Sequence, residues 1–147
     1  MKILVPVDGS KYSLEALKIA IDCAKSKNAE IIVISVASDA GGGGVDLEIS
    51  AGERDRINER MERQASSVIK SACDLVAKES IKADCKVVIA YSSVADAILS
   101  TVEKDKIDLI IMGSRGLSPS SRFKMGSVAS QVVKHSDCSV YVVKMAA

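Results

Sequence analysis

The sequence of 147 residues has little of several features on which whole classes of protein depend. It contains no Trp, and aromatic residues make up only 3% of it. It therefore lacks the stacking platforms with which proteins hold single-stranded nucleic acid. Its formal net charge is +1, because 20 Lys and Arg are balanced by 19 Asp and Glu. A chain so balanced offers no basic surface, and we expect neither nucleic acid nor a membrane as a partner.

Long apolar runs are also missing. The longest, such as Ile31–Val36 and Leu109–Met112, are far shorter than the ~20 residues of a membrane-spanning helix. The first residues reach Asp8 too early for a secretory signal peptide. Hydrophobic residues nevertheless make up 48% of the chain, which is too many for a disordered protein. We expect a single cytoplasmic domain over residues 1–147.

The four cysteines stand far apart, and none forms a CxxC pair. This spacing supports neither a zinc site nor a thioredoxin-like redox motif. We expect small, buried hydrophobic side chains at all four positions: Cys23, Cys73, Cys85 and Cys138. The one histidine, His135, has no cluster of metal ligands around it and is expected in the last turn of a helix, where a cation is favoured.

Short apolar runs alternate with helical patterns along the chain. The runs predict strands over 2–7, 31–36, 86–90, 109–112 and 139–144. The helical patterns between them cover 14–24, 51 to about 79, 94–102 and 127–135. Five strands alternating with four helices predict an α/β fold, a doubly wound parallel sheet with helices on both faces.

Two of the helices have apolar stripes that are expected to pack on the sheet. In the first helix the stripe is formed by Leu14, Leu17, Ile21 and Ala24. In the second, which is expected from 51 to about 79, it is formed by Ile57, Met61, Ala65, Val68, Ala72 and Leu75. The run Gly41–Gly44 before this helix indicates a flexible loop whose role stays open.

Ligands of such sheets bind outside the carboxyl ends of the strands, so the residues that follow the strands are informative. Gly113 follows the fourth strand, and the absence of a side chain there allows close approach of a ligand, whereas Gly116 permits the turn that follows. Gly126 and Ser127 begin a helix, whose amides and dipole favour an anion. The cations of this segment are Arg115, Arg122 and Lys124. A phosphate site is one interpretation, and a plain helix cap is the other.

Other phosphate-binding and catalytic motifs are absent from the sequence. There is no GxxxxGK[ST] of P-loop NTPases, and Gly41–Gly44 does not complete a GxGxxG. No GxSxG elbow of α/β-hydrolases occurs. A receiver domain has an acidic cluster after its first strand, whereas only Asp8 stands there.

One spacing is more specific. Gly113-x2-Gly116-x9-Gly126-Ser127 resembles the G-2x-G-9x-G-[S/T] signature of the ATP-binding branch of the universal stress proteins. The opening ILVPVDGSKYSLEALKIA is similar to the first strand and helix of that family, and SVYVVK is similar to its last strand. The resemblance covers essentially the whole chain.

The resemblance implies a strand order of 3-2-1-4-5 and an adenine-nucleotide site. Pro6, Val7 and Asp8 would line the ribose and adenine, Val36 would read the adenine edge, and Met112 with Gly113 would lie under the ribose. The phosphates would be held by Gly116, Gly126, Ser127 and Val128, with Arg115 nearby. The implied cofactor is ATP, AMP or ADP with Mg²⁺ or Mn²⁺. Turn chemistry at Asp8-Gly9-Ser10 is the alternative role of Asp8.

These observations favour a nucleotide-binding regulatory module of the stress response. The alternatives are a slow ATPase or autophosphorylating enzyme, with Ser118, Ser120 and Ser121 as acceptors, and an interaction protein without nucleotide. No general base is identified near the phosphate loop, so no catalytic residue is assigned. The apolar last strand, 139–144, would lie at a sheet edge, and we expect a homodimer paired through it.

Overall fold

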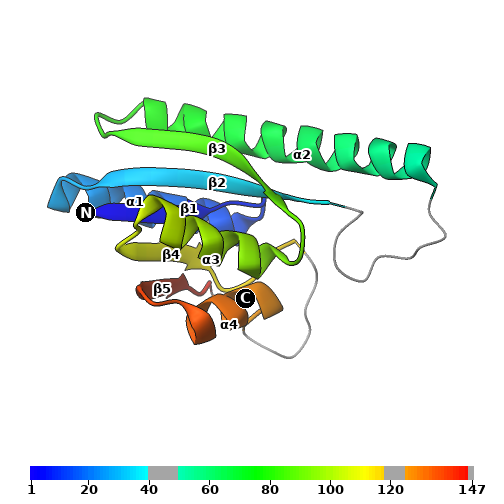
Figure 1. Ribbon diagram of the computed structural model, residues 1–147. Coiled ribbons are helices and arrows are strands. Elements are labelled where there is room, and N and C mark those ends of the chain that lie inside the picture. Colours follow the sequence, from blue (N-terminus) through cyan, green and yellow to red (C-terminus); the bar gives the residue numbers. More distant parts are fainter. Residues whose placement is uncertain (40–49, 118–124, 146–147) are drawn as a thin grey trace.

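The computed structural model of the protein describes residues 1–39, 50–117 and 125–145. It consists of one sheet and four helices (Figure 1). The strands are β1 Lys2–Pro6, β2 Glu30–Ser38, β3 Ala83–Ala90, β4 Leu109–Gly113 and β5 Ser139–Val143. The helices are α1 Lys11–Lys27, α2 Ala51–Ala77, α3 Val94–Asp105 and α4 Ser127–His135.

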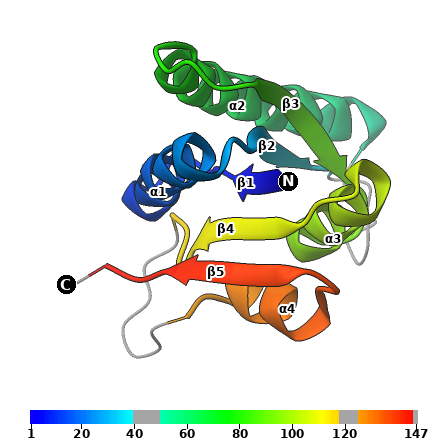
Figure 2. The ribbon, with the colours of Figure 1, turned by 90° about the vertical axis from the view of Figure 1, so that its left-hand side faces the viewer.

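The five strands form a parallel sheet in the order β3-β2-β1-β4-β5, which confirms the predicted fold and strand order. Helices α1 and α2 lie on one face of this sheet, and α3 and α4 lie on the other (Figure 2). The order of the strands reverses at β1, because β2 and β3 lie on one side of it and β4 and β5 lie on the other. In doubly wound folds this reversal is where ligands bind.

Alternate residues of the central strands enter two separate cores. On β1, Ile3 and Val5 belong to the core beneath α1 and α2, whereas Leu4 belongs to the core beneath α3 and α4. On β2, Ile31 and Ile32 alternate in the same way. Burial on both faces explains why these strands are apolar at nearly every position.

The cores also correct the predicted helix stripes. Leu14 was expected to be buried but is 40% exposed, because α1 buries the side of the helix that carries Ser13, Ala16 and Leu17. On α2, Ala65 and Ala72 are buried as predicted, whereas Met61 is 37% exposed. Periodicity identifies the apolar side of a helix, but it does not decide which residues at the margin of that side are buried.

Helix α2 is longer than the strands it covers. Its 27 residues span about 40 Å, whereas the eight residues of β3 span about 26 Å. No residue before Ala65 in this helix is buried. The amino-terminal half of α2 therefore extends past the carboxyl ends of the strands, as Figure 1 shows.

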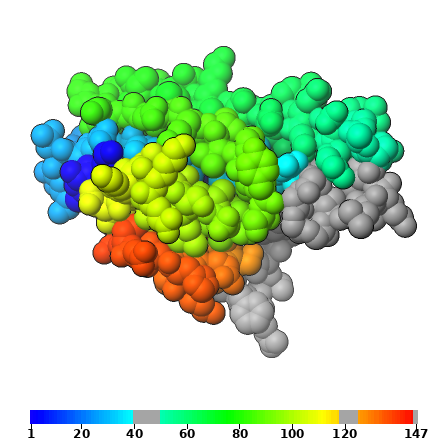
Figure 3. Space-filling model, viewed as in Figure 1, coloured from blue at the N-terminus to red at the C-terminus, as the bar shows by residue number. Residues whose placement is uncertain are grey.

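The opposite face of the sheet is covered by α3 and α4, which lie side by side (Figure 3). His135 is in the last turn of α4 and is exposed, as predicted. No helix among the described residues is long and apolar enough to cross a membrane.

The cysteines are only partly buried, and all four are free thiols. The predicted burial of all four is therefore confirmed only in part: Cys23 and Cys85 pack against the core beneath α1 and α2, Cys138 packs against the other core, and Cys73 belongs to neither. Burial raises the pKa of the Cys85 thiol to about 12, helped by a hydrogen bond with the thiol of Cys73 and by the charge of Asp84. Cys85 is therefore protonated at neutral pH.

Candidate functional site

The main pocket of the described structure lies at the carboxyl edge of the sheet, where the strand order reverses. It has a volume of about 750 Å³, a size typical of small-molecule sites. The ends of β1, β2 and β4 form its floor, and the first turns of α1, α3 and α4 border it. All eleven residues expected at the site line it: Pro6, Val7, Asp8, Val36, Met112, Gly113, Arg115, Gly116, Gly126, Ser127 and Val128.

Asp8 enters the pocket from the turn that joins β1 to α1. Its Oδ1 accepts a hydrogen bond of 2.9 Å from the backbone N–H of Ser10, and its own N–H donates to Ser13 Oγ at 3.3 Å. Ser10 in turn caps α1, because its Oγ accepts from Ser13 N at 3.2 Å. The hydrogen bond from Ser10 thus uses one carboxylate oxygen of Asp8, and the same side chain lines the pocket. The two roles proposed for Asp8 are compatible.

The other oxygen of Asp8 faces the loop after β4. A Cβ added at Gly116 would lie 2.6 Å from Asp8 Oδ2, which is closer than real contacts allow. Among the described glycines only Gly9 has a positive φ, of 86°, so Gly116 serves this close approach and not a left-handed turn.

Gly113 is required for a different reason from the expected one. A Cβ at this position would lie 2.7 Å from Tyr12 Cβ and 2.9 Å from the backbone C of Tyr12. The missing side chain therefore makes room for the first turn of α1 beside β4. The sequence indicated a close approach at Gly113, but the neighbour is the protein's own helix.

The beginning of α4 is held beside the end of β4 by buried Ser114. The N–H of Ser114 donates to the carbonyl of Val143 at 2.9 Å, and its carbonyl accepts from Gly126 N at 2.7 Å. Gly126 is the N-cap of α4 and makes no side-chain capping bond. The other three helices are capped by the hydroxyl groups of Ser10, Ser50 and Ser93.

The first amides of α4 therefore meet the pocket without a capping side chain, and Ser127 adds an exposed hydroxyl beside them. Unpaired amides at a helix N-terminus attract an anion. Arg115, also on the pocket wall, adds a positive charge. The remaining expected groups, Arg122, Lys124 and the serines between 118 and 121, lie outside the described residues, as does the Gly41–Gly44 run.

Several pocket residues were missed by the sequence reasoning. Most have no polar group that would mark them as functional. They are Ser13, Ser38, Met61, Val94, Ile98, Ser114, Leu117, Met125 and Ala129. The remaining signal was their position in the chain, since Ser38 follows the strand predicted over 31–36 and Val94 begins a predicted helix.

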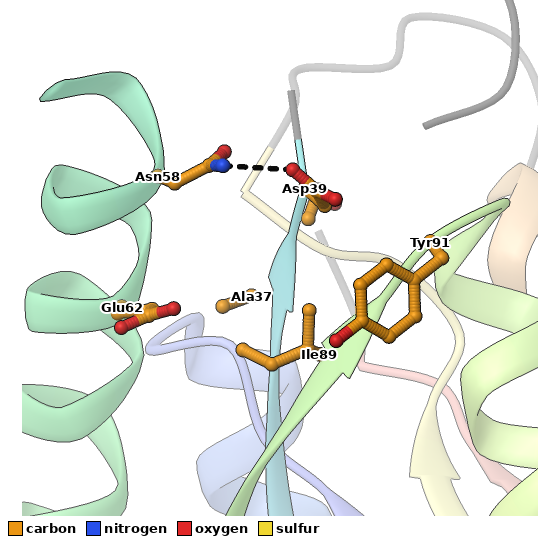
Figure 4. A pocket seen from close by; sticks show the side chains of 7 residues that line it. Ala37, Asp39, Asn58, Glu62, Ile89 and Tyr91 are labelled. Carbon is orange, nitrogen blue, oxygen red and sulfur yellow. Dashed lines mark hydrogen bonds between the residues drawn. The ribbon is translucent and has the colours of Figure 1, made fainter. Parts of the chain in front are cut away.

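A second, smaller pocket of about 150 Å³ adjoins the main one, and Ser38 lines both. Figure 4 shows its side chains coming from α2, β2 and β3. Asn58 Nδ2 donates to Asp39 Oδ1 at 2.8 Å, and Glu62 and Tyr91 complete the polar part of the wall. Two carboxylates at this end of the strands disfavour a phosphate there.

The chain matches known proteins along almost its whole length. Residues 1–144 match the model of the universal stress protein family. A universal stress protein of Methanocaldococcus jannaschii is 34% identical over 143 residues, which cover 97% of this chain and 81% of that protein. The solved structure of UspA from Lactobacillus plantarum has a TM-score of 0.81 at 25% identity and covers 98% of this chain and 97% of its own.

Three further structural neighbours have nucleotides bound. A family protein of Arabidopsis thaliana with AMP bound has a TM-score of 0.70 at 18% identity, covering 100% of this chain and 93% of that one. The universal stress protein of Archaeoglobus fulgidus in complex with dAMP has a TM-score of 0.70 at 19% identity, covering 98% of both chains. A third neighbour, a universal stress protein in complex with cAMP, has a TM-score of 0.71 at 22% identity and covers 99% of this chain and 98% of its own. At these sequence identities, the similarity of the three structures to this chain establishes a shared fold and nothing more.

The contact between Gly113 and Tyr12 leads to a testable prediction for stability. Gly113→Ala forces α1 and β4 apart and should lower the free energy of unfolding by about 1–3 kcal/mol, the range for overpacked sites. Gly52→Ala is the matched control, because nothing lies within 4 Å of its Cβ position on α2. It should leave the stability unchanged or raise it by up to about 1 kcal/mol. Equal urea midpoints for the two variants would contradict the assigned contact.

Proposed function

Because the chain belongs to the universal stress protein family, we propose that it binds an adenine nucleotide in the main pocket and acts as a nucleotide-binding regulatory module. The observation that carries this proposal is the uncapped beginning of α4, which borders a pocket of nucleotide size. The AMP, dAMP and cAMP complexes of structural neighbours support the choice of adenine.

The charges at the two ends of the pocket support one orientation of the nucleotide. In the proposal the phosphates lie at the α4 end, near Arg115, Gly126 and Ser127. The base lies at the opposite end, toward Val36, because Asp39 and Glu62 beyond it repel phosphate. The ribose then lies between them, beside Asp8.

The spacing of the three glycines supports membership of the ATP-binding branch, with ATP, ADP and AMP as the candidate ligands. The proposal includes a Mg²⁺ or Mn²⁺ ion only as an ion that the phosphates of the nucleotide would bind. Mg²⁺ is commonly held by one or two carboxylates together with substrate phosphates. Among the described pocket residues the one carboxylate is Asp8, and Ser127 supplies a hydroxyl. No metal-binding group of three or more His, Cys, Asp or Glu occurs in the described part of the chain.

Binding is favoured over hydrolysis by the side chains available. The described wall of the pocket contains no His and no second carboxylate to orient water or accept its proton. His135 stands eight residues after Ser127 on α4, a distance of about 12 Å along the helix. A single-turnover assay with labelled ATP distinguishes binding from slow hydrolysis or autophosphorylation.

Gly126→Val should abolish nucleotide binding with little loss of stability. A Cβ at Gly126 would lie 3.5 Å from the Ser114 carbonyl oxygen, an ordinary contact, so the backbone can carry a side chain there, and the valine methyl groups should block the proposed phosphate position. We expect no binding heat in ATP and AMP calorimetry, with a wild-type far-UV spectrum and melting curve. Unchanged affinity in the folded variant would contradict the assigned phosphate site.

Asp8→Asn and Asp8→Ala separate the two roles of this side chain. Asn retains an oxygen that can accept from Ser10 N, so its stability should stay near that of the wild type. Ala loses that bond and the charge, and it should weaken nucleotide binding by about 10- to 150-fold, the effect of a charged hydrogen bond of about 1.5–3 kcal/mol. If Ala lowers only the melting temperature and leaves calorimetric affinity intact, Asp8 serves the turn alone.

We also propose that the protein is a homodimer paired through β5, which lies at the edge of the sheet. The Val143 carbonyl accepts from Ser114 N, so the backbone of Val143 faces the β4 side. Peptide groups alternate along a strand, and the N–H and carbonyl of Val142 therefore face the open edge. Tyr141 is 51% exposed on this strand. Antiparallel pairing with a second β5 would satisfy the outward groups and close the assembly.

Sedimentation at micromolar concentration tests the dimer. The wild type should sediment as a dimer, and Val142→Pro should sediment as a folded monomer, because proline removes an outward donor and leaves the Val143–Ser114 bond intact. A wild-type monomer would overturn the proposal. A dimer that survives in folded Val142→Pro would place the interface elsewhere.

A further inference from the structure

Met61 occupies an unusual position on α2. It lies four residues, or one helical turn, before buried Ala65, and so points toward the same side of the helix. Ala65 has the sheet beneath it, whereas Met61 is 37% exposed and lines the main pocket. It is the only α2 residue among those described on that wall.

Helix α2 passes close to the turn that leads from β1 to α1. A Cβ at Gly9 would lie 3.3 Å from Val68 Cγ2, which places α2 directly beside the turn that follows Asp8. Met61 is seven residues earlier, about 10 Å along the helix axis toward its amino-terminal end. This direction leads beyond the ends of the strands, where α2 extends past the sheet in Figure 1.

Charge determines which part of a ligand Met61 would meet. Asp39 and Glu62 line the adjoining small pocket, and Glu62 follows Met61 in the chain. Phosphate is disfavoured at this end, and the positive groups near α4 lie at the other. At the end of β2 the main pocket is lined by apolar Val36, which packs with the core beneath α3 and α4, and an apolar wall suits a flat, uncharged ring.

We propose that Met61 is a base-recognition residue, whose thioether packs on the face of the purine and makes the amino-terminal half of α2 one wall of the ligand site. The inference rests on the proposed nucleotide function and adds a specificity determinant from outside the glycine signature. Methionine suits this role, because its polarisable sulfur makes favourable contacts with aromatic rings.

A contact between the base and Met61 should also change how readily the amino-terminal half of α2 opens. Residues 51–64 bury no side chain fully, and their described tie to the strands is the bond from Asn58 to Asp39. A base held against Met61 adds a further tie. Amide exchange of this segment should therefore slow when AMP binds, and less so when the ligand lacks a base.

The test compares AMP with ribose 5-phosphate, which has the sugar and phosphate but no base. Met61→Gln should weaken AMP binding by about three- to tenfold in calorimetry, because it replaces the apolar surface against the ring with an amide that binding must desolvate, and should leave ribose 5-phosphate binding unchanged. Met61→Leu should stay within about twofold of the wild type, because it keeps the apolar surface. Ser66→Gln, an exposed position on the opposite side of α2, is the control and should change neither affinity.

Two results would overturn the inference. One is wild-type AMP affinity in Met61→Gln, with the AMP-dependent slowing of exchange in residues 51–64 retained. The other is an equal loss of affinity for AMP and ribose 5-phosphate, which would give Met61 a structural role. In both cases the wild type still binds AMP and the nucleotide function stands. A wild type that binds neither ligand would instead overturn the proposed function, and this inference with it.

Discussion

The reversal of strand order at β1 is the constraint on which the site depends. Because β1 pairs with β2 on one side and β4 on the other, α1 and α4 begin on opposite faces of the sheet at the same edge. The space between these beginnings becomes the main pocket. Two glycines allow close packing around the pocket. Gly113 leaves room for Tyr12 of α1, and Gly116 leaves room for the carboxylate of Asp8. Both glycines therefore set the positions of protein groups around the pocket.

The four helix beginnings show how a local difference can produce a site. Three helices satisfy their first amides with a serine hydroxyl, which stabilises each end by about 1 kcal/mol. The fourth begins at Gly126, which stabilises a helix end less than serine by a few tenths of a kcal/mol. Such a loss is typical of functional positions, where a ligand supplies what the side chain does not. The backbone bond from Gly126 to Ser114 keeps α4 in place without a cap.

Much of this arrangement could be predicted from the sequence because two independent signals agreed. Strands with apolar residues on both faces required a parallel sheet, and the glycine spacing identified the family and with it the strand order. The eleven expected residues meet in one pocket because the ends of the strands and the beginnings of the helices share one edge of the sheet.

What could not be predicted depends on tertiary packing. The burial of Ser13 in place of Leu14 follows from the angle at which α1 crosses the sheet, and periodicity carries no information about that angle. Met61 looks like a core residue in the sequence and reaches the pocket only because the sheet ends before α2 does. The reason for Gly113 was likewise hidden, since Tyr12 is a hundred residues away in the chain.

The central claim is that this edge of the sheet holds an adenine nucleotide. Native mass spectrometry of the protein, incubated with ATP or AMP and then exchanged into volatile buffer, tests it most directly. The account predicts a mass increase of one nucleotide for each chain in the wild type and none in folded Gly126→Val. A wild type that carries no nucleotide after incubation at millimolar concentration would contradict it.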